Sequence, residues 1–201
     1  ESIREYNHMG KRAYIVTQSI KKLKKEEKEW ALDPQGFKKV YDDTPVDITK
    51  LNSNDKGLYY KDEPYTTKKL HQRLIITYSP KYAAYQRTIR DKQVERAQKM
   101  LDSGNTKKNR KNPNDPARFI EKTAVTPEGE AADIKYSLDE NKITEETLYD
   151  GLYAVCTDLL DDNVADILKV SEGRWQIEEC FRIMKTDFSA RPVYLQDENR
   201  I

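Results

Sequence analysis

Four charged residues at helical spacing within an apolar frame are the feature that most constrains this chain. Steps of four, four and three positions would place them on one face of an α-helix: Arg174, Glu178, Arg182 and Lys185. The same segment supplies apolar residues that could hold this helix against a core: Trp175, Ile177, Phe181, Met184 and Phe188. The sequence therefore predicts a helix that presents one carboxylate flanked by three cations.

Two interpretations of this helix are open. Glu178 and Arg182 form an i,i+4 pair, which contributes about 0.2–0.5 kcal/mol on any exposed helix and needs no function. Alternatively, Glu178 is a metal ligand, because Mg²⁺ is commonly held by one or two carboxylates together with phosphate oxygens. The neighbouring cations would then contact the phosphate backbone of a nucleic acid.

The residues around Glu178 resemble a known signature. The letters RWQIEECFR, followed by MK and ARPVY, are similar to the Y-x2-R-x3-E-x6-K pattern of DDE transposases from bacterial insertion sequences. Arg174, Glu178 and Lys185 occupy its arginine, glutamate and lysine positions, whereas Ser171 stands where the family has tyrosine. The segment AYIVTQSIKKLKKE and the DG-x-Y strand that begins at Asp150 resemble that family too.

This resemblance implies a fold and a chemistry. The fold would be α/β, part of a ribonuclease H-like catalytic core (residues 1–36 and 148–201) interrupted by a β-rich insertion with a long helix (residues 37–147). The chemistry would be DNA strand cleavage and strand transfer by two-metal phosphoryl transfer, with Mg²⁺ or Mn²⁺ held by two aspartates and Glu178. Lys185 would contact a backbone phosphate, and Arg174 would orient the glutamate or contact the transposon end.

The two aspartates are not identified in this chain. The resemblance places the second one upstream of Glu1, and no pair of acidic residues stands at the ends of adjacent predicted strands. We therefore expect a fragment that binds Mg²⁺ or Mn²⁺ weakly and cleaves no DNA alone. The full-length parent is expected in the bacterial cytoplasm, as a homodimer on transposon-end and target DNA.

Composition limits other functions. There are 36 basic and 35 acidic residues, so any nucleic-acid contact must come from local basic patches rather than from bulk charge. Helix 79–101 and the loop 107–111 (KKNRK) offer such patches and support an alternative, a non-catalytic nucleic-acid-binding module. A third possibility is a structural protein with a solvated charged helix. The sequence contains no Walker loop, metal-spaced Cys/His set, nucleophile elbow or membrane-length apolar run.

The pattern along the chain predicts alternating strands and helices. Strands are expected at 12–20, 73–78, 119–123, 132–138 and 148–157, with two or three short strands and turns at 52–57 and 62–64 between residues 37 and 67. Helices are expected at 21–32, at 79–101 with Ser79 as N-cap, and after the N-cap candidates Asp161, Asp162 and Asn163.

The sequence also predicts the burial or role of several individual side chains. Cys156 and Cys180 are predicted to be core thiols, and Asp150 a turn residue rather than a catalytic acid. In helix 79–101 the apolar stripe is expected at Tyr82, Tyr85, Ile89, Ala97 and Met100, with the basic residues, Arg90 among them, on the surface.

Overall fold

The computed structural model describes residues 12–67, 70–106, 114–125, 133–173, 180–181 and 183. The strands are β1 (Ile15–Thr17), β2 (Lys38–Lys39), β3 (Tyr59–Thr67), β4 (Leu70–Tyr78), β5 (Ile120–Val125), β6 (Asp133–Leu138) and β7 (Leu152–Thr157). The α-helices are α2 (Lys25–Leu32), α3 (Pro80–Asp102), α4 (Glu140–Thr147) and α5 (Val164–Glu172). Three 3₁₀ turns complete the described elements: η1 (Ile20–Lys22), η2 (Ile48–Lys50) and η3 (Pro116–Phe119).

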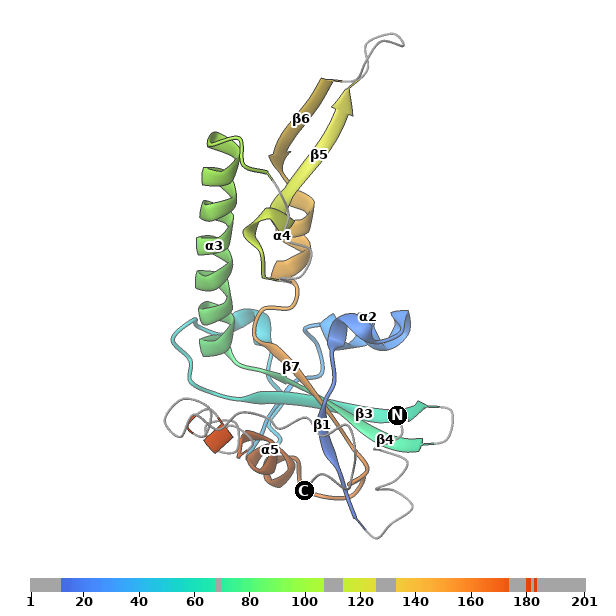
Figure 1. Ribbon diagram of the computed structural model, residues 1–201. Coiled ribbons are helices and arrows are strands. Elements are labelled where there is room, and N and C mark those ends of the chain that lie inside the picture. The colour runs from blue at the N-terminus through green and yellow to red at the C-terminus, as the bar shows by residue number, and fades with distance from the viewer. Residues whose placement is uncertain are drawn as a thin grey trace. The chain divides into compact units, whose positions relative to one another are not determined.

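The fold is mixed α/β and contains antiparallel strand pairs. One sheet has the strand order β1-β7-β4-β3-β2, and β5 and β6 form a separate two-stranded sheet (Figure 1). The second pair is an antiparallel hairpin whose register runs from Ile120 opposite Leu138 to Val125 opposite Asp133. In the larger sheet, β2 pairs antiparallel with the start of β3. The coarse α/β prediction is therefore confirmed.

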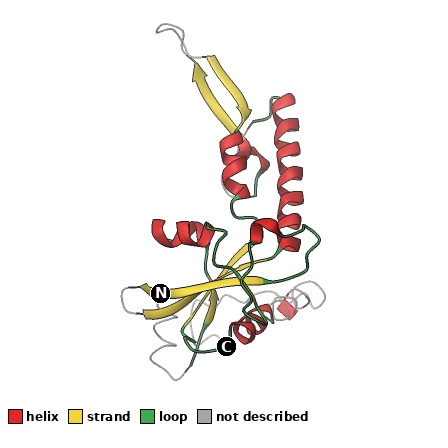
Figure 2. Cartoon of the chain, turned by 180° about the vertical axis from the view of Figure 1, so that it is seen from behind, coloured by secondary structure: helices red, strands yellow, loops and turns green. Residues whose placement is uncertain are grey.

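The chain divides into two compact units. The first comprises Glu1–Val16, Pro64–Arg73 and Cys156–Ile201, and the second comprises Thr17–Glu63 and Leu74–Val155. Within the second unit, α3 lies alongside α4, and the β5–β6 hairpin extends from the same end of this pair in both views (Figures 1 and 2). A small core of Ala97, Ala117, Phe119 and Ile120 joins α3, η3 and the hairpin.

The predicted central strands are confirmed. In β4, Leu74, Ile75 and Ile76 are fully buried, and in β7 Ala154 and Val155 are at most 1% exposed. Such continuous apolar runs are typical of strands that are covered on both faces. The β7 strand begins only at Leu152, because the predicted turn at residues 149–151 precedes it.

The predicted helix boundaries are confirmed in part. Ser79 caps α3 by accepting a hydrogen bond from the Tyr82 backbone N–H at 3.4 Å, and Pro80 occupies the first turn. The helix ends before Gly104, which has a φ of +69°. By contrast, α2 begins at Lys25 rather than Lys21, because residues 20–22 form a 3₁₀ turn.

The turn predicted at residues 62–64 is wrong. Strand β3 continues from Tyr59 to Thr67, through an exposed Pro64. Its neighbour β2 is only two residues long and pairs with Tyr59 and Tyr60. Beyond Tyr60 this side of β3 has no named strand beside it, and proline is tolerated in a strand where no neighbour requires its missing N–H.

The expected apolar stripe of α3 is also wrong in its first half. Tyr82, Tyr85 and Ile89 are 41%, 59% and 39% exposed, and the buried positions of the helix include Ala83, Arg90 and Ala97. Those three buried residues are seven positions apart, or two helical turns, so they share one face. Sequence analysis followed the larger aromatic side chains and therefore placed Arg90 on the wrong side.

Lys61 is the buried cation of β3, with only 3% of its surface exposed. Its ammonium donates hydrogen bonds of 2.5 Å to the backbone carbonyls of Trp30 and Asp33, at the C-terminal end of α2. It also lies 4.8 Å from the ring centroids of Trp30 and Phe37. Burial lowers the pKa of Lys61 to about 8, although the charges of Asp33 and Glu63 oppose that shift.

This depressed pKa predicts a pH-dependent stability. Lys61 loses its proton near pH 8 in the folded chain but near its ordinary pKa of 10.5 when unfolded, so between these values the unfolded state binds more protons. Stability contributed by this residue should therefore rise with pH in that window. We expect the free energy of urea unfolding, relative to Lys61→Met, to increase by on the order of 3 kcal/mol across it. A pH-independent difference between the two proteins would contradict this assignment.

Candidate functional site

The three predicted site residues, Arg174, Glu178 and Lys185, lie outside the described residues, and so does the basic loop 107–111. The structure describes what flanks them. Helix α5 runs to Glu172. The backbone N–H of Gly173 donates a hydrogen bond to the Lys169 carbonyl and so closes the last turn. Residues 180, 181 and 183 are helical.

Helix α5 is anchored as its sequence predicts. The N-cap candidates were Asp161, Asp162 and Asn163. Asn163 caps the helix, because its side-chain oxygen accepts a hydrogen bond from the Ala165 N–H at 2.8 Å. The buried residues of the helix are Val164, Ile167 and Leu168. Arg73, from β4, donates to the Asp162 carbonyl at 2.7 Å and so fixes the approach to the helix.

Two predictions for the following segment are corrected. Cys156 is a buried thiol, as expected, whereas Cys180 is exposed. Phe181, which was expected to pack against the core, is 57% exposed. The apolar pattern around Glu178 therefore does not describe a helix buried through these two positions.

The acidic residue directly after β7 forms a structural hydrogen bond. Asp158 follows this strand, and its Oδ1 accepts the Tyr14 backbone N–H at 2.9 Å, while Thr157 Oγ1 donates to the Tyr14 carbonyl at 2.7 Å. Both side chains thus join β7 to the segment before β1. Within the described parts of the chain, no three His, Cys, Asp or Glu side chains come together as a metal site.

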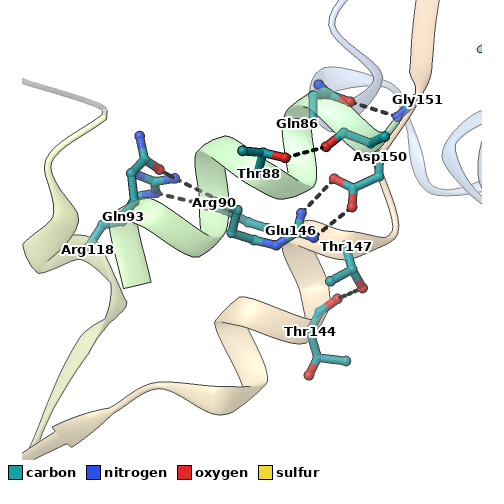
Figure 3. A network of polar contacts seen from close by, with 11 residues as sticks. Gln86, Thr88, Arg90, Gln93, Arg118, Thr144, Glu146, Thr147, Asp150 and Gly151 are labelled. Atoms are coloured by element: carbon teal, nitrogen blue, oxygen red, sulfur yellow. Dashed lines mark hydrogen bonds and ion pairs between the residues drawn. The ribbon is translucent and has the colours of Figure 1, made fainter. Parts of the chain in front are cut away.

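The described residues do form a polar network in the second unit (Figure 3). Arg90 of α3 donates two hydrogen bonds to Asp150, of 2.6 and 2.7 Å. The two side chains are only 8% and 11% exposed. The hydrogen bond to Asp150 raises the pKa of Arg90 further, against the effect of burial. Asp150 is in the predicted turn, but it is also the partner of a buried ion pair.

A second arginine–carboxylate pair lies in the same network (Figure 3). Arg118 of η3 contacts both carboxylate oxygens of Glu146 at 3.1 Å, and its Nη2 also donates to Gln93 at 2.5 Å. Burial acts to raise the pKa of Glu146, but the hydrogen bond and charge of Arg118, with Lys21 and Lys142, outweigh it and the pKa is lowered. Glu146 belongs to α4, a short helix with no fully buried residue, which sequence analysis missed.

These residues line a cavity of about 350 Å³. Its walls come from α3, η3, the end of α4 and the turn before β7, with Lys21 of η1 contributing as well. The seven-residue spacing of Ala83, Arg90 and Ala97 is the sequence signal that could have identified the buried arginine. No local pattern pairs it with Asp150, which is 60 positions away.

Comparisons with known proteins add no relationship: no protein-family model, no curated protein and no solved structure matches this chain. Among the described residues, none of the helices combines the length and the hydrophobicity that crossing a membrane requires.

Gly151 holds the turn of this network close to α3, and we predict that replacing it destabilises the fold more than replacing Gly104 does. Its φ is +78°, and an added Cβ would lie 2.8 Å from the Tyr78 ring and 2.9 Å from the Ala83 Cβ. Gly104 has a similar φ of +69° but no atom within 4 Å of such a Cβ. Gly104→Ala should cost about 1–2 kcal/mol for the backbone conformation alone. Gly151→Ala should cost about 1–3 kcal/mol more, from steric overlap.

Urea unfolding of the two glycine variants tests this difference. Equal destabilisation by Gly104→Ala and Gly151→Ala would show that the backbone conformation alone matters and that the turn is not tightly packed against α3.

Proposed function

We propose that this chain is part of a DNA transposase, from after the second catalytic aspartate to just past the catalytic glutamate. The observation that carries the proposal is the sequence of the segment from Ser171 to Tyr194, with Arg174, Glu178 and Lys185 at signature spacing. The helical conformation of residues 180, 181 and 183 is consistent with a signature carried on a helix.

The arrangement before this segment also supports the proposal. A buried strand, β7, is followed by a short connection and by the capped amphipathic helix α5, which ends one residue before Arg174 and its neighbours begin. The mixed α/β fold is compatible with a ribonuclease H-like core, which we propose for the segments that flank residues 37–147.

In this proposal the side chains have separate tasks. Glu178 contributes one carboxylate to a pair of Mg²⁺ or Mn²⁺ ions, and the aspartates that complete the ligand set come from the parent protein. When bound, such ions stabilise the attacking and leaving oxygens of a phosphodiester. Lys185 neutralises a backbone phosphate, and Arg174 orients Glu178 or contacts the transposon end.

The first test measures Mn²⁺ binding to the chain by electron paramagnetic resonance, in the presence of transposon-like duplex DNA. We expect weak binding that Glu178→Gln abolishes and that Glu172→Gln, which changes an exposed acid on α5, leaves intact. No DNA cleavage is expected from the chain alone. Unchanged Mn²⁺ binding in Glu178→Gln would contradict the assigned ligand.

Two other outcomes separate the alternatives. Divalent-dependent nicking by this chain, abolished by Glu178→Ala, would support the transposase chemistry but overturn the fragment interpretation. DNA binding with a steep salt dependence, unchanged by Glu178→Gln and without metal binding, would favour the non-catalytic nucleic-acid-binding module.

A further inference from the structure

The cavity beside the Arg90–Asp150 pair has the charge and the walls of a small-molecule site. Its volume of about 350 Å³ is at the lower end of the range of roughly 300–1,000 Å³ that is typical of ligand pockets. The described residues that line it come mainly from η1, α3, η3, α4 and the turn before β7.

The described part of the lining carries a net positive charge. It contains three cations, Lys21, Arg90 and Arg118, and two carboxylates, Glu146 and Asp150. Each carboxylate is paired with one arginine through both of its oxygens. The ammonium of Lys21 lies 4.9 Å from the centroid of the Tyr149 ring. A ligand with one negative charge would balance this lining.

Arg118 offers an unused hydrogen-bond donor. Its Nε and Nη2 bind Glu146 and Gln93, but its Nη1 is buried and has no hydrogen-bond partner among the described residues. Buried donors in folded proteins nearly always have a partner, and a guanidinium can only donate. The guanidinium therefore keeps positive charge that is incompletely compensated at the wall of the cavity, although this nitrogen itself is not exposed.

Aromatic rings form the remaining wall. Tyr82 and Tyr85 stack on each other with their centroids 6.3 Å apart and their planes 22° from parallel. Both are unusually exposed for large side chains, and the partly exposed Ile89 lies one turn further along α3. A flat ring can stack on such tyrosines, and it would gain free energy from leaving water as well as from ring–ring contact.

We propose that this cavity binds a small planar aromatic molecule that carries one anionic group. The anionic group is held by the ammonium of Lys21 beside the guanidinium of Arg118, and the ring lies against Tyr82 and Tyr85. Nucleoside monophosphates and aromatic carboxylic acids share this chemistry, and they differ in whether a phosphate or a carboxylate supplies the acceptor oxygens.

Titration followed by nuclear magnetic resonance tests the proposal, with four probes: thymidine monophosphate, 4-hydroxybenzoate, uncharged thymidine and inorganic phosphate. We expect at least one of the two aromatic anions to bind saturably, with a Kd below about 1 mM, and to shift the guanidinium signals of Arg118. Thymidine and inorganic phosphate should bind at least roughly tenfold more weakly, because each lacks half of the recognised chemistry. Whichever aromatic anion binds identifies the acidic group.

Variants locate the binding. Tyr85→Ala and Lys21→Gln, both at exposed positions, should each lower the affinity for the anion that binds by roughly fivefold or more. Tyr41→Ala, which removes an 89% exposed tyrosine outside the described lining of the cavity, should leave the affinity unchanged. Three results would each overturn the proposal: no saturable binding, equal affinity for thymidine and its monophosphate, or full affinity in both cavity variants.

Discussion

The buried ion pair between Arg90 and Asp150 is the interaction on which the second unit depends. Removing two charges from water costs more than a simple contact returns, so such a pair is tolerated only when both groups keep their hydrogen bonds. Here the guanidinium and the carboxylate meet through two short bonds, and Gly151 lets the turn approach α3 without a Cβ in the way. The buried ion pair and the close packing of Gly151 against Ala83 and Tyr78 together join α3 to the turn before β7.

We propose two different chemistries for this chain. The proposed catalytic contribution lies in a sequence signature after α5, where one carboxylate and two cations are expected to act on a phosphodiester. The proposed ligand cavity lies among residues of α3, η3 and α4, where each carboxylate is already paired with an arginine. A carboxylate engaged in this way is poorly suited to bind a metal ion, which is why the cavity favours an anionic ligand over a cation.

Sequence analysis predicted the elements with strong local signals and missed those that depend on distant partners. Ser79-Pro80 and Asn163 mark helix starts through their own side chains, and the apolar run of β7 needs both faces covered. The short helix α4 has one large apolar residue, Ile143, and its start is marked by Asp139, whose side chain accepts a hydrogen bond from the Lys142 N–H; this short signal was missed. The spacing of Ala83, Arg90 and Ala97 marks the buried face of α3, but no local pattern pairs Arg90 with Asp150, 60 positions away.

The coupling free energy between Arg90 and Asp150 tests this account most directly. It is obtained from urea unfolding of Arg90→Met, Asp150→Asn and the double variant, with the exposed pair of Glu95 and Lys99 as a matched control. Each single change should cost about 3–5 kcal/mol because it leaves a buried charge or donor unpaired, and the double variant should cost far less than the sum. The control pair should couple by less than about 1 kcal/mol. Additive costs at Arg90 and Asp150 would show that the pair does not hold this unit together.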